Sequence, residues 1–164
     1  MSLGAELAAS PPAALAGAMA GLRWRDLGLD LASQLPPHGW STLKLHVDDD
    51  CEVGLFFLRR GEHIPLHDHP GLHVWMRVLT GELDVTSYTW ADPPYARRTG
   101  AARLGPDAPV WLVEPRRDNL HTLTAAQDVA FLDVLRPPYR ADGPCTYYRA
   151  LPTAADLWRM QPLT

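Results

Sequence analysis

The chain has 164 residues, 46% hydrophobic and 21% charged, which is the composition of one globular domain and not of a disordered segment. A net charge of −4 gives no reason to expect a polyanion partner, so we do not expect nucleic-acid binding. The two cysteines are too few for a disulfide scaffold, and no apolar run is long enough to span a membrane. We therefore expect a single domain over residues 1–164, located in the cytoplasm without a membrane partner.

The first 40 residues contain the only helical patterns. Leucines recur at loosely helical intervals from about residue 5 to residue 34, and Pro11 and Pro12 divide this stretch into two short pieces. Because the opening segment lacks a basic region and carries Glu6, it does not resemble a secretory signal. We expect residues 1–40 to be a helical segment that packs on the rest of the domain.

From residue 41 onward the pattern changes to short strands. Apolar or alternating runs are separated by Gly, Pro and Asp, and most of the 16 prolines fall between the runs, where they cannot interrupt a central strand. Many short strands with turn signals predict an all-β barrel or sandwich over residues 41–164, with the last dozen residues capping one end. The predicted strands are 43–47, 53–58, 74–79, 82–90, 110–113 and 129–135.

Histidines cluster in one short stretch. Side chains two apart on a strand face the same side, so His67 and His69 can present two imidazoles to one metal ion while Asp68 faces away. A third ligand must come from elsewhere, and His121, in the run 120–124, is the best candidate. Two further histidines of the cluster, which we place at the rim or behind the ligands, are His63 and His73.

Several motifs carry a resemblance to known proteins. The stretch Gly61 to His69 followed by Gly81 resembles the first cupin motif, and Pro115 with His121 resembles a modified second motif that lacks the usual glutamate. Four segments between residues 55 and 150, in the same order, closely resemble the family of plant cysteine oxidases and cysteamine dioxygenases. They are 64–71, 119–121, 131–139 and 145–148. The resemblance implies a cupin-type barrel (double-stranded β-helix, jelly roll) and a monomer.

The resemblance also implies the metal and the reaction. Three histidines alone suit zinc or copper as readily as iron, so Fe(2+) follows from the resemblance and not from the spacing. Three neutral ligands leave the ion its full charge, which a substrate thiolate can neutralise. The implied reaction adds both atoms of O2 to a thiol to give a sulfinic acid. The thiol is an N-terminal cysteine of a protein or peptide, in which case the protein could sense oxygen, or a small aminothiol such as cysteamine.

Other candidate site residues follow the histidines. Asp133 interrupts the apolar run 129–135, and the resemblance implies that it bonds a ligand histidine or the substrate amine; the alternative is a structural carboxylate held by backbone amides. Tyr139 is expected to bond oxygen or substrate, or else to pack in a turn. Cys145 and Tyr147 could cross-link, as in some family members, although an inert buried cysteine is more common.

Two other functions remain open from the residues. A mercapto-acid dioxygenase would need an arginine that binds the substrate carboxylate, and the candidates are Arg77, Arg116 and Arg117. A metal-binding cupin module without catalysis would bind the ion tightly but take up no oxygen.

Overall fold

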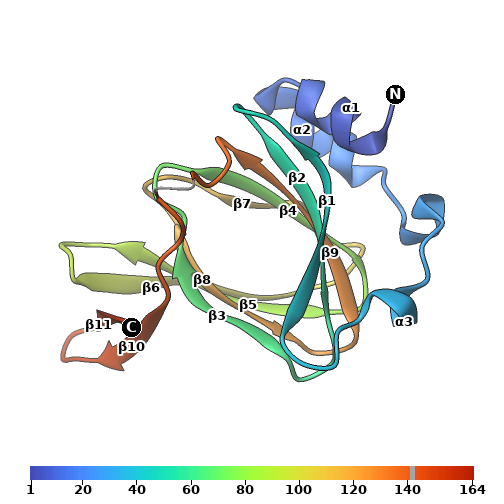
Figure 1. The fold of residues 1–164 in the computed structure, drawn as a ribbon. Coiled ribbons are helices and arrows are strands. Elements are labelled where there is room, and N and C mark those ends of the chain that lie inside the picture. The colour runs from blue at the N-terminus through green and yellow to red at the C-terminus, as the bar shows by residue number, and fades with distance from the viewer. Residues whose placement is uncertain (141–142) are drawn as a thin grey trace.

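Two antiparallel β-sheets face each other in the computed structural model of the protein, which describes residues 1–140 and 143–164 (Figure 1). The five-stranded sheet contains, in spatial order, β1 (Trp40–Val47), β2 (Glu52–Leu58), β9 (Val129–Arg136), β4 (His73–Thr80) and β7 (Trp111–Val113). The six-stranded sheet contains β10 (Tyr148–Pro152), β11 (Leu157–Pro162), β6 (Tyr95–Leu104), β5 (Leu83–Trp90), β8 (Leu120–Ala125) and β3 (His63–Asp68).

Strands that pair are often far apart in the sequence. For example, β2 pairs with β9 and β3 pairs with β8, so the chain crosses repeatedly from one sheet to the other. This topology is that of a jelly roll, also called a double-stranded β-helix, and it confirms the predicted fold class. The named strands stay in two separate sheets and do not close into one hydrogen-bonded barrel.

Each run predicted as a strand overlaps a strand of the structure, although Glu82 and Val110, the first residues of two predicted runs, lie just outside β5 and β7. The structure adds β6, which the pattern did not reveal because most of its side chains are exposed and several are polar or charged. The C-terminal residues, expected to cap one end, instead form β10 and β11. These strands extend the six-stranded sheet beyond β6 and project from the body of the fold (Figure 1).

The N-terminal helices cover the outer face of the five-stranded sheet (Figure 1). They are α1 (Leu3–Ala9), α2 (Pro12–Ala20), the 3-10 helix η1 (Trp24–Leu27) and α3 (Leu31–Gln34). Pro12 is at the start of α2, where its fixed φ favours a helix. Gly4 allows α1 to approach β1 closely, because a Cβ at this position would lie 2.5 Å from the carbonyl oxygen of Leu45. None of the described helices combines the length and apolar character needed to cross a membrane.

Alternate residues of the central strand β9 serve two different apolar clusters. Leu132 and Val134 belong to the cluster that joins the helices to the five-stranded sheet. Phe131 belongs to the cluster between the two sheets. Because strand side chains alternate, Asp133 shares the inner face with Phe131 and Leu135. A carboxylate is thereby placed in the interior between the sheets.

Candidate metal centre

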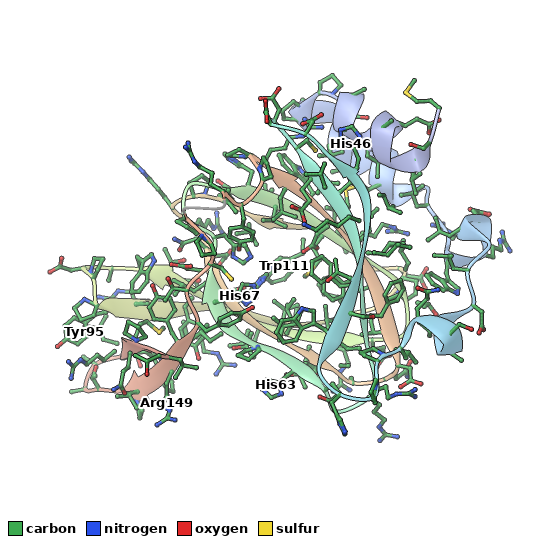
Figure 2. The ribbon with its side chains drawn as sticks, in the orientation of Figure 1. His46, His63, His67, Tyr95, Trp111 and Arg149 are labelled. Atoms are coloured by element: carbon green, nitrogen blue, oxygen red, sulfur yellow. The ribbon has the colours of Figure 1, made fainter. Side chains whose placement is uncertain are left out.

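Three histidines converge on the inner face of the six-stranded sheet. His67 on β3 and His121 on β8 are paired directly opposite each other, and His69 follows the last residue of β3. The ring centroids of the three side chains are 4.4 to 4.8 Å apart. One nitrogen from each lies within 4.8 Å of the others, which is suitable for binding one metal ion. Figure 2 shows His67 directed into the space between the sheets and His63 directed away from it.

Backbone carbonyls orient two of these rings. The Nδ1 atom of His67 lies 2.7 Å from the carbonyl oxygen of Pro65, and that of His69 lies 3.1 Å from the carbonyl oxygen of Asn119. A ring that donates from Nδ1 carries its lone pair on Nε2, which is the arrangement typical of metal-binding histidines. The buried Nδ1 of His121 has no hydrogen-bond partner among the described residues.

The electrostatic environment keeps the three rings neutral. Burial lowers the pKa of His67, and it lowers the pKa of His121 well below the ordinary value. Burial, followed by the neighbouring His67, lowers the pKa of His69 to about 3. Neutral imidazoles have free lone pairs at neutral pH, so no proton must leave before a metal binds. The donor set therefore fits a metal ion, and we describe it as a three-histidine metal site.

A cavity of about 90 Å³ adjoins the three histidines. Its polar lining comes from the histidines together with Asp133, Tyr139, Cys145 and Tyr147, and Asp133 is the only carboxylate among the described residues that line it. The apolar walls are formed by Trp40, Phe56, Ile64, Leu123, Phe131 and Leu135. The rings of Phe56 and Phe131 stack with their centroids 5.0 Å apart, which gives this wall an apolar aromatic surface.

Asp133 is buried in this cavity with one carboxyl oxygen unpaired. Its Oδ1 atom has no hydrogen-bond partner among the described residues, so neither a histidine nor a backbone amide holds that oxygen. Burial raises the pKa of Asp133 well above the ordinary value, and the negative charge of Glu52 raises it further. The carboxyl group is therefore suited to receive a cationic or hydrogen-bond donor group that enters the cavity.

Tyr139 lines the cavity and is tied to the histidine strand. Its hydroxyl donates a hydrogen bond of 2.9 Å to the carbonyl oxygen of Asp68, and its ring lies 6.1 Å from that of His69. Burial raises the pKa of Tyr139, so the phenol stays protonated. As expected, the Asp68 side chain faces away from the histidines. It accepts hydrogen bonds from the backbone of Thr146 at 2.8 Å and from the hydroxyl of Tyr148 at 3.1 Å.

Cys145 and Tyr147 line the same cavity although Cys145 is not part of a strand. Their side chains lie close enough for each to influence the pKa of the other. Tyr147 forms an isolated bridge with His67, and the two rings lie 5.8 Å apart. Burial raises the pKa of Tyr147 to about 12. The pair is thus next to the metal site and in mutual contact.

Other residues considered from the sequence lie outside the cavity. His63 and His73 are exposed, and the ring of His73 stacks on Trp75 with the centroids 5.9 Å apart. Arg116 and Arg117 are exposed in the loop between β7 and β8. Arg77 is buried on the opposite face of the five-stranded sheet. No arginine or lysine is among the described residues that line the cavity.

Sequence reasoning missed two parts of the site. The apolar wall of Trp40, Phe56 and Phe131 could have been inferred only from which face of each strand points inward. Asp68 was correctly placed facing away, but its bonds to Thr146 and Tyr148 join segments about 80 residues apart, and no local pattern indicates them.

The chain has a cupin-type fold with three histidines placed so that they could hold one metal ion. A cupin superfamily protein from Desulfitobacterium hafniense is 19% identical with a TM-score of 0.50, covering 67% of this chain and 90% of that chain. A protein from Klebsiella pneumoniae with a double-stranded β-helix domain is 14% identical with a TM-score of 0.54, covering 73% and 88%. At these identities the likeness concerns the fold alone.

The chain belongs to the PCO_ADO family, whose model matches residues 30–161. It is 33% identical over 149 residues to 2-aminoethanethiol dioxygenase of Homo sapiens, covering 71% of this chain and 55% of that protein. It is 36% identical over 121 residues to plant cysteine oxidase 1 of Arabidopsis thaliana, covering 67% and 41%. The chain therefore spans about half the length of these relatives. The family resemblance seen in the sequence is confirmed.

Proposed function

We propose that this protein is a non-haem iron thiol dioxygenase in which His67, His69 and His121 hold Fe(2+). The observation that carries the proposal is that three neutral histidines face a cavity also lined by Asp133, whose Oδ1 atom has no partner among the described residues. When bound, iron would supply the Lewis acidity that deprotonates a thiol and the redox chemistry that O2 requires. Membership of the PCO_ADO family supports iron over zinc or copper.

The reaction that we propose converts a thiol and O2 into a sulfinic acid. The O–O bond and the S–H bond are broken, both oxygen atoms form bonds to sulfur, and the thiol proton ends on the product acid or in solvent. Sulfur is oxidised and O2 is reduced, so no further co-reactant is needed. The apolar walls formed by Phe56 and Phe131 exclude water from this chemistry.

The proposed substrate is a thiol with a nearby free amine. An ammonium group would neutralise Asp133 and donate a hydrogen bond to its free Oδ1 atom, and charge-assisted hydrogen bonds of this kind are strong. A mercapto-acid would instead bring a second negative charge into a cavity lined by no arginine or lysine among the described residues. The cavity chemistry thus favours the aminothiol.

The size of the cavity limits what enters it. A water-sized group needs roughly 10–15 Å³ of such volume. The cavity of about 90 Å³ therefore has room for the heavy atoms of a 2-aminothiol and one O2. Cysteamine fits as a whole, and an N-terminal cysteine fits with the rest of its peptide outside. Trp40 lines the cavity and is 37% exposed, so this wall reaches the surface where a peptide would leave.

We propose two roles for the remaining polar residues. Tyr139, already donating to Asp68, keeps a lone pair that can accept a hydrogen bond from the substrate, and it holds the histidine strand in place. Cys145 and Tyr147, in contact beside His67, are the candidates for a cross-link. We further propose that the protein works as a cytoplasmic monomer, and as an oxygen sensor if its substrates are protein N-termini.

A comparison of four thiols tests the substrate class. Iron-loaded protein would be supplied with cysteamine, a peptide beginning with cysteine, the same peptide N-acetylated, and 3-mercaptopropionate. We expect oxygen consumption with the first two and little with the last two, because only the first two carry a free amine. Equal rates with 3-mercaptopropionate would favour the mercapto-acid dioxygenase. No consumption by fully loaded protein with any thiol would favour the non-catalytic module.

A further inference from the structure

Arg77 on β4 carries a buried charge that the metal centre does not use. The residue is 5% exposed, and its Nη2 atom donates to the carbonyl oxygens of Leu22 at 3.3 Å and Pro106 at 3.0 Å. Its Nε atom is buried without a hydrogen-bond partner, and none of the ion pairs among the described residues includes it. Because a buried guanidinium without an anion is costly, a counter-charge is expected nearby.

The side chain of Arg77 reaches a second cavity on the helix-covered side of the five-stranded sheet. This Arg77 cavity has a volume of about 520 Å³, within the range of roughly 300–1,000 Å³ that is usual for small-molecule sites. Arg23 also lines it, with apolar or small neighbours from α2 and from the segment before β7. Examples of these are Ala16, Gly17, Ala20, Pro109 and Val110.

The charges in the Arg77 cavity favour an anion. Two arginines and one carboxylate, Asp107, line it, which leaves an excess of one positive charge. Arg77 is buried, whereas Arg23 and Asp107 are exposed, and the Nη1 atom of Arg23 also donates to the carbonyl oxygens of Ala20 and Leu22. Burial lowers the pKa of Arg77, the positive charge of Arg23 lowers it further, and Asp107 acts in the opposite direction. An anion between the two guanidinium groups would relieve both their repulsion and the unmet charge of Arg77.

We propose that the Arg77 cavity is a binding site for a small oxyanion, either a carboxylate or a phosphate group, held by Arg23 and Arg77. A guanidinium group presents two parallel N–H donors, which can bind two oxygens of a carboxylate or phosphate group at once. The small apolar wall leaves space for a short carbon skeleton attached to that group. The site is separate from the metal centre, because the two cavities share no lining residue in the part of the chain that the structure describes.

A purely structural role for Arg77 makes a different prediction. Its bonds to Leu22 and Pro106 tie the end of α2 to the loop before β7, and this tie requires no ligand. Under that interpretation, replacement of Arg77 would lower stability, but the intact protein would bind no oxyanion. Variants that leave Arg77 in place therefore test the proposal best.

The test measures binding of sodium phosphate and of sodium succinate by calorimetry at constant ionic strength, with chloride as the reference anion. Arg23→Gln removes a charge from the cavity, and Arg25→Gln removes one from a side chain that is 87% exposed and does not line it. We expect saturable binding of one of the two probes to the natural sequence. Arg23→Gln should weaken it at least about tenfold, or roughly 1.4 kcal/mol, and Arg25→Gln should not.

A second pair of variants blocks the cavity without changing charge. Gly17 lines the cavity within α2, and a Cβ there would meet no heavy atom within 4 Å. Gly17→Leu should fill the space and abolish binding while leaving the fold intact, because leucine favours a helix more than glycine does. Gly17→Ala is the control and should retain binding.

Each outcome of these binding experiments either supports or overturns the proposed oxyanion site. Binding of phosphate alone or succinate alone identifies the group that the site takes, and loss in Arg23→Gln and Gly17→Leu supports the proposal. The absence of saturable binding of both probes to the natural sequence up to about 10 mM would overturn it. Equal weakening by Arg25→Gln would overturn it as well, because binding would then depend on general charge.

Discussion

The hydroxyl of Tyr139 donates a hydrogen bond of 2.9 Å to the carbonyl oxygen of Asp68, the residue between His67 and His69. The side chain of Asp68 points the other way, toward Thr146 and Tyr148. The strand that carries two histidines is therefore held from both sides by the segment that follows β9. The proposed ligands owe their positions to these contacts as well as to β-sheet pairing.

Tyr139→Phe and Tyr148→Phe each remove one hydroxyl that bonds Asp68, but only Tyr139 lines the cavity. Each should lower the free energy of unfolding by about 1 kcal/mol, as the loss of one hydrogen bond does. Only Tyr139→Phe should lower kcat, by about tenfold, because its phenol also contacts the reacting groups. Denaturant unfolding, bound metal and kcat of both variants provide the comparison. Equal kcat values for the two variants would show that the role of Tyr139 is structural only.

Asp133→Asn keeps the shape of the side chain but removes its charge. Loss of a charge-assisted contact to the substrate amine is worth about 1.5–3 kcal/mol, so kcat/KM for cysteamine should fall roughly 10- to 100-fold. Oxidation of 3-mercaptopropionate, which has no amine, should fall much less. Steady-state kinetics on both thiols measure the difference. A matched loss on both would show that Asp133 does not recognise the amine.

The metal-free protein should lose stability as the pH falls below 6.5. The three histidines have lowered pKa values in the folded state, with that of His69 at about 3, so between 6.5 and about 3 the unfolded chain binds more protons than the folded one. Each histidine ring that stays neutral in the folded state lowers the free energy of unfolding by up to about 1.4 kcal/mol for each unit by which the pH falls in this range. Urea unfolding at pH 7 and pH 5 measures the slope.

The control for this experiment uses Asp133→Asn as the background. Asp133 contributes to the pH dependence of stability in the opposite direction. Because its pKa is raised in the folded state, its contribution lowers the free energy of unfolding as the pH rises above the ordinary pKa of 3.8. In that background, His69→Gln should reduce the slope, whereas His73→Gln, which changes an exposed ring, should not. An unchanged slope in His69→Gln would contradict the assignment of a buried neutral histidine.

A thioether between Cys145 and Tyr147 would join two side chains that already contact each other. It would lower the mass of the intact protein by two hydrogens after incubation with iron and oxygen. We expect this mass change in the natural sequence and not in Cys145→Ser or Tyr147→Phe. High-resolution mass spectrometry of the intact protein and its peptides provides the measurement. An unchanged mass after full turnover would show that the two side chains are neighbours without a covalent bond.

Much of the fold was predictable because its signals are local. Strand alternation placed His67 and His69 on one side and Asp133 among inward-facing residues, and the structure agrees. The exposed strand β6 gave no such signal, because polar side chains on an outer strand resemble a loop. The contacts of Asp68, and the placement of Arg77 outside the metal cavity, depend on how distant strands pack together. Such packing leaves no trace in sequence spacing.

The central claim is tested most directly by anaerobic reconstitution with ferrous iron, followed by oxygen consumption and product mass with cysteamine and with a peptide beginning in cysteine. His121→Ala, which removes one of the three converging nitrogens, is the matched control. We predict a gain of two oxygen atoms, both derived from O2, on at least one of the two thiols, and no gain in the control. A fully iron-loaded protein that consumes no oxygen with either thiol would contradict the proposed function.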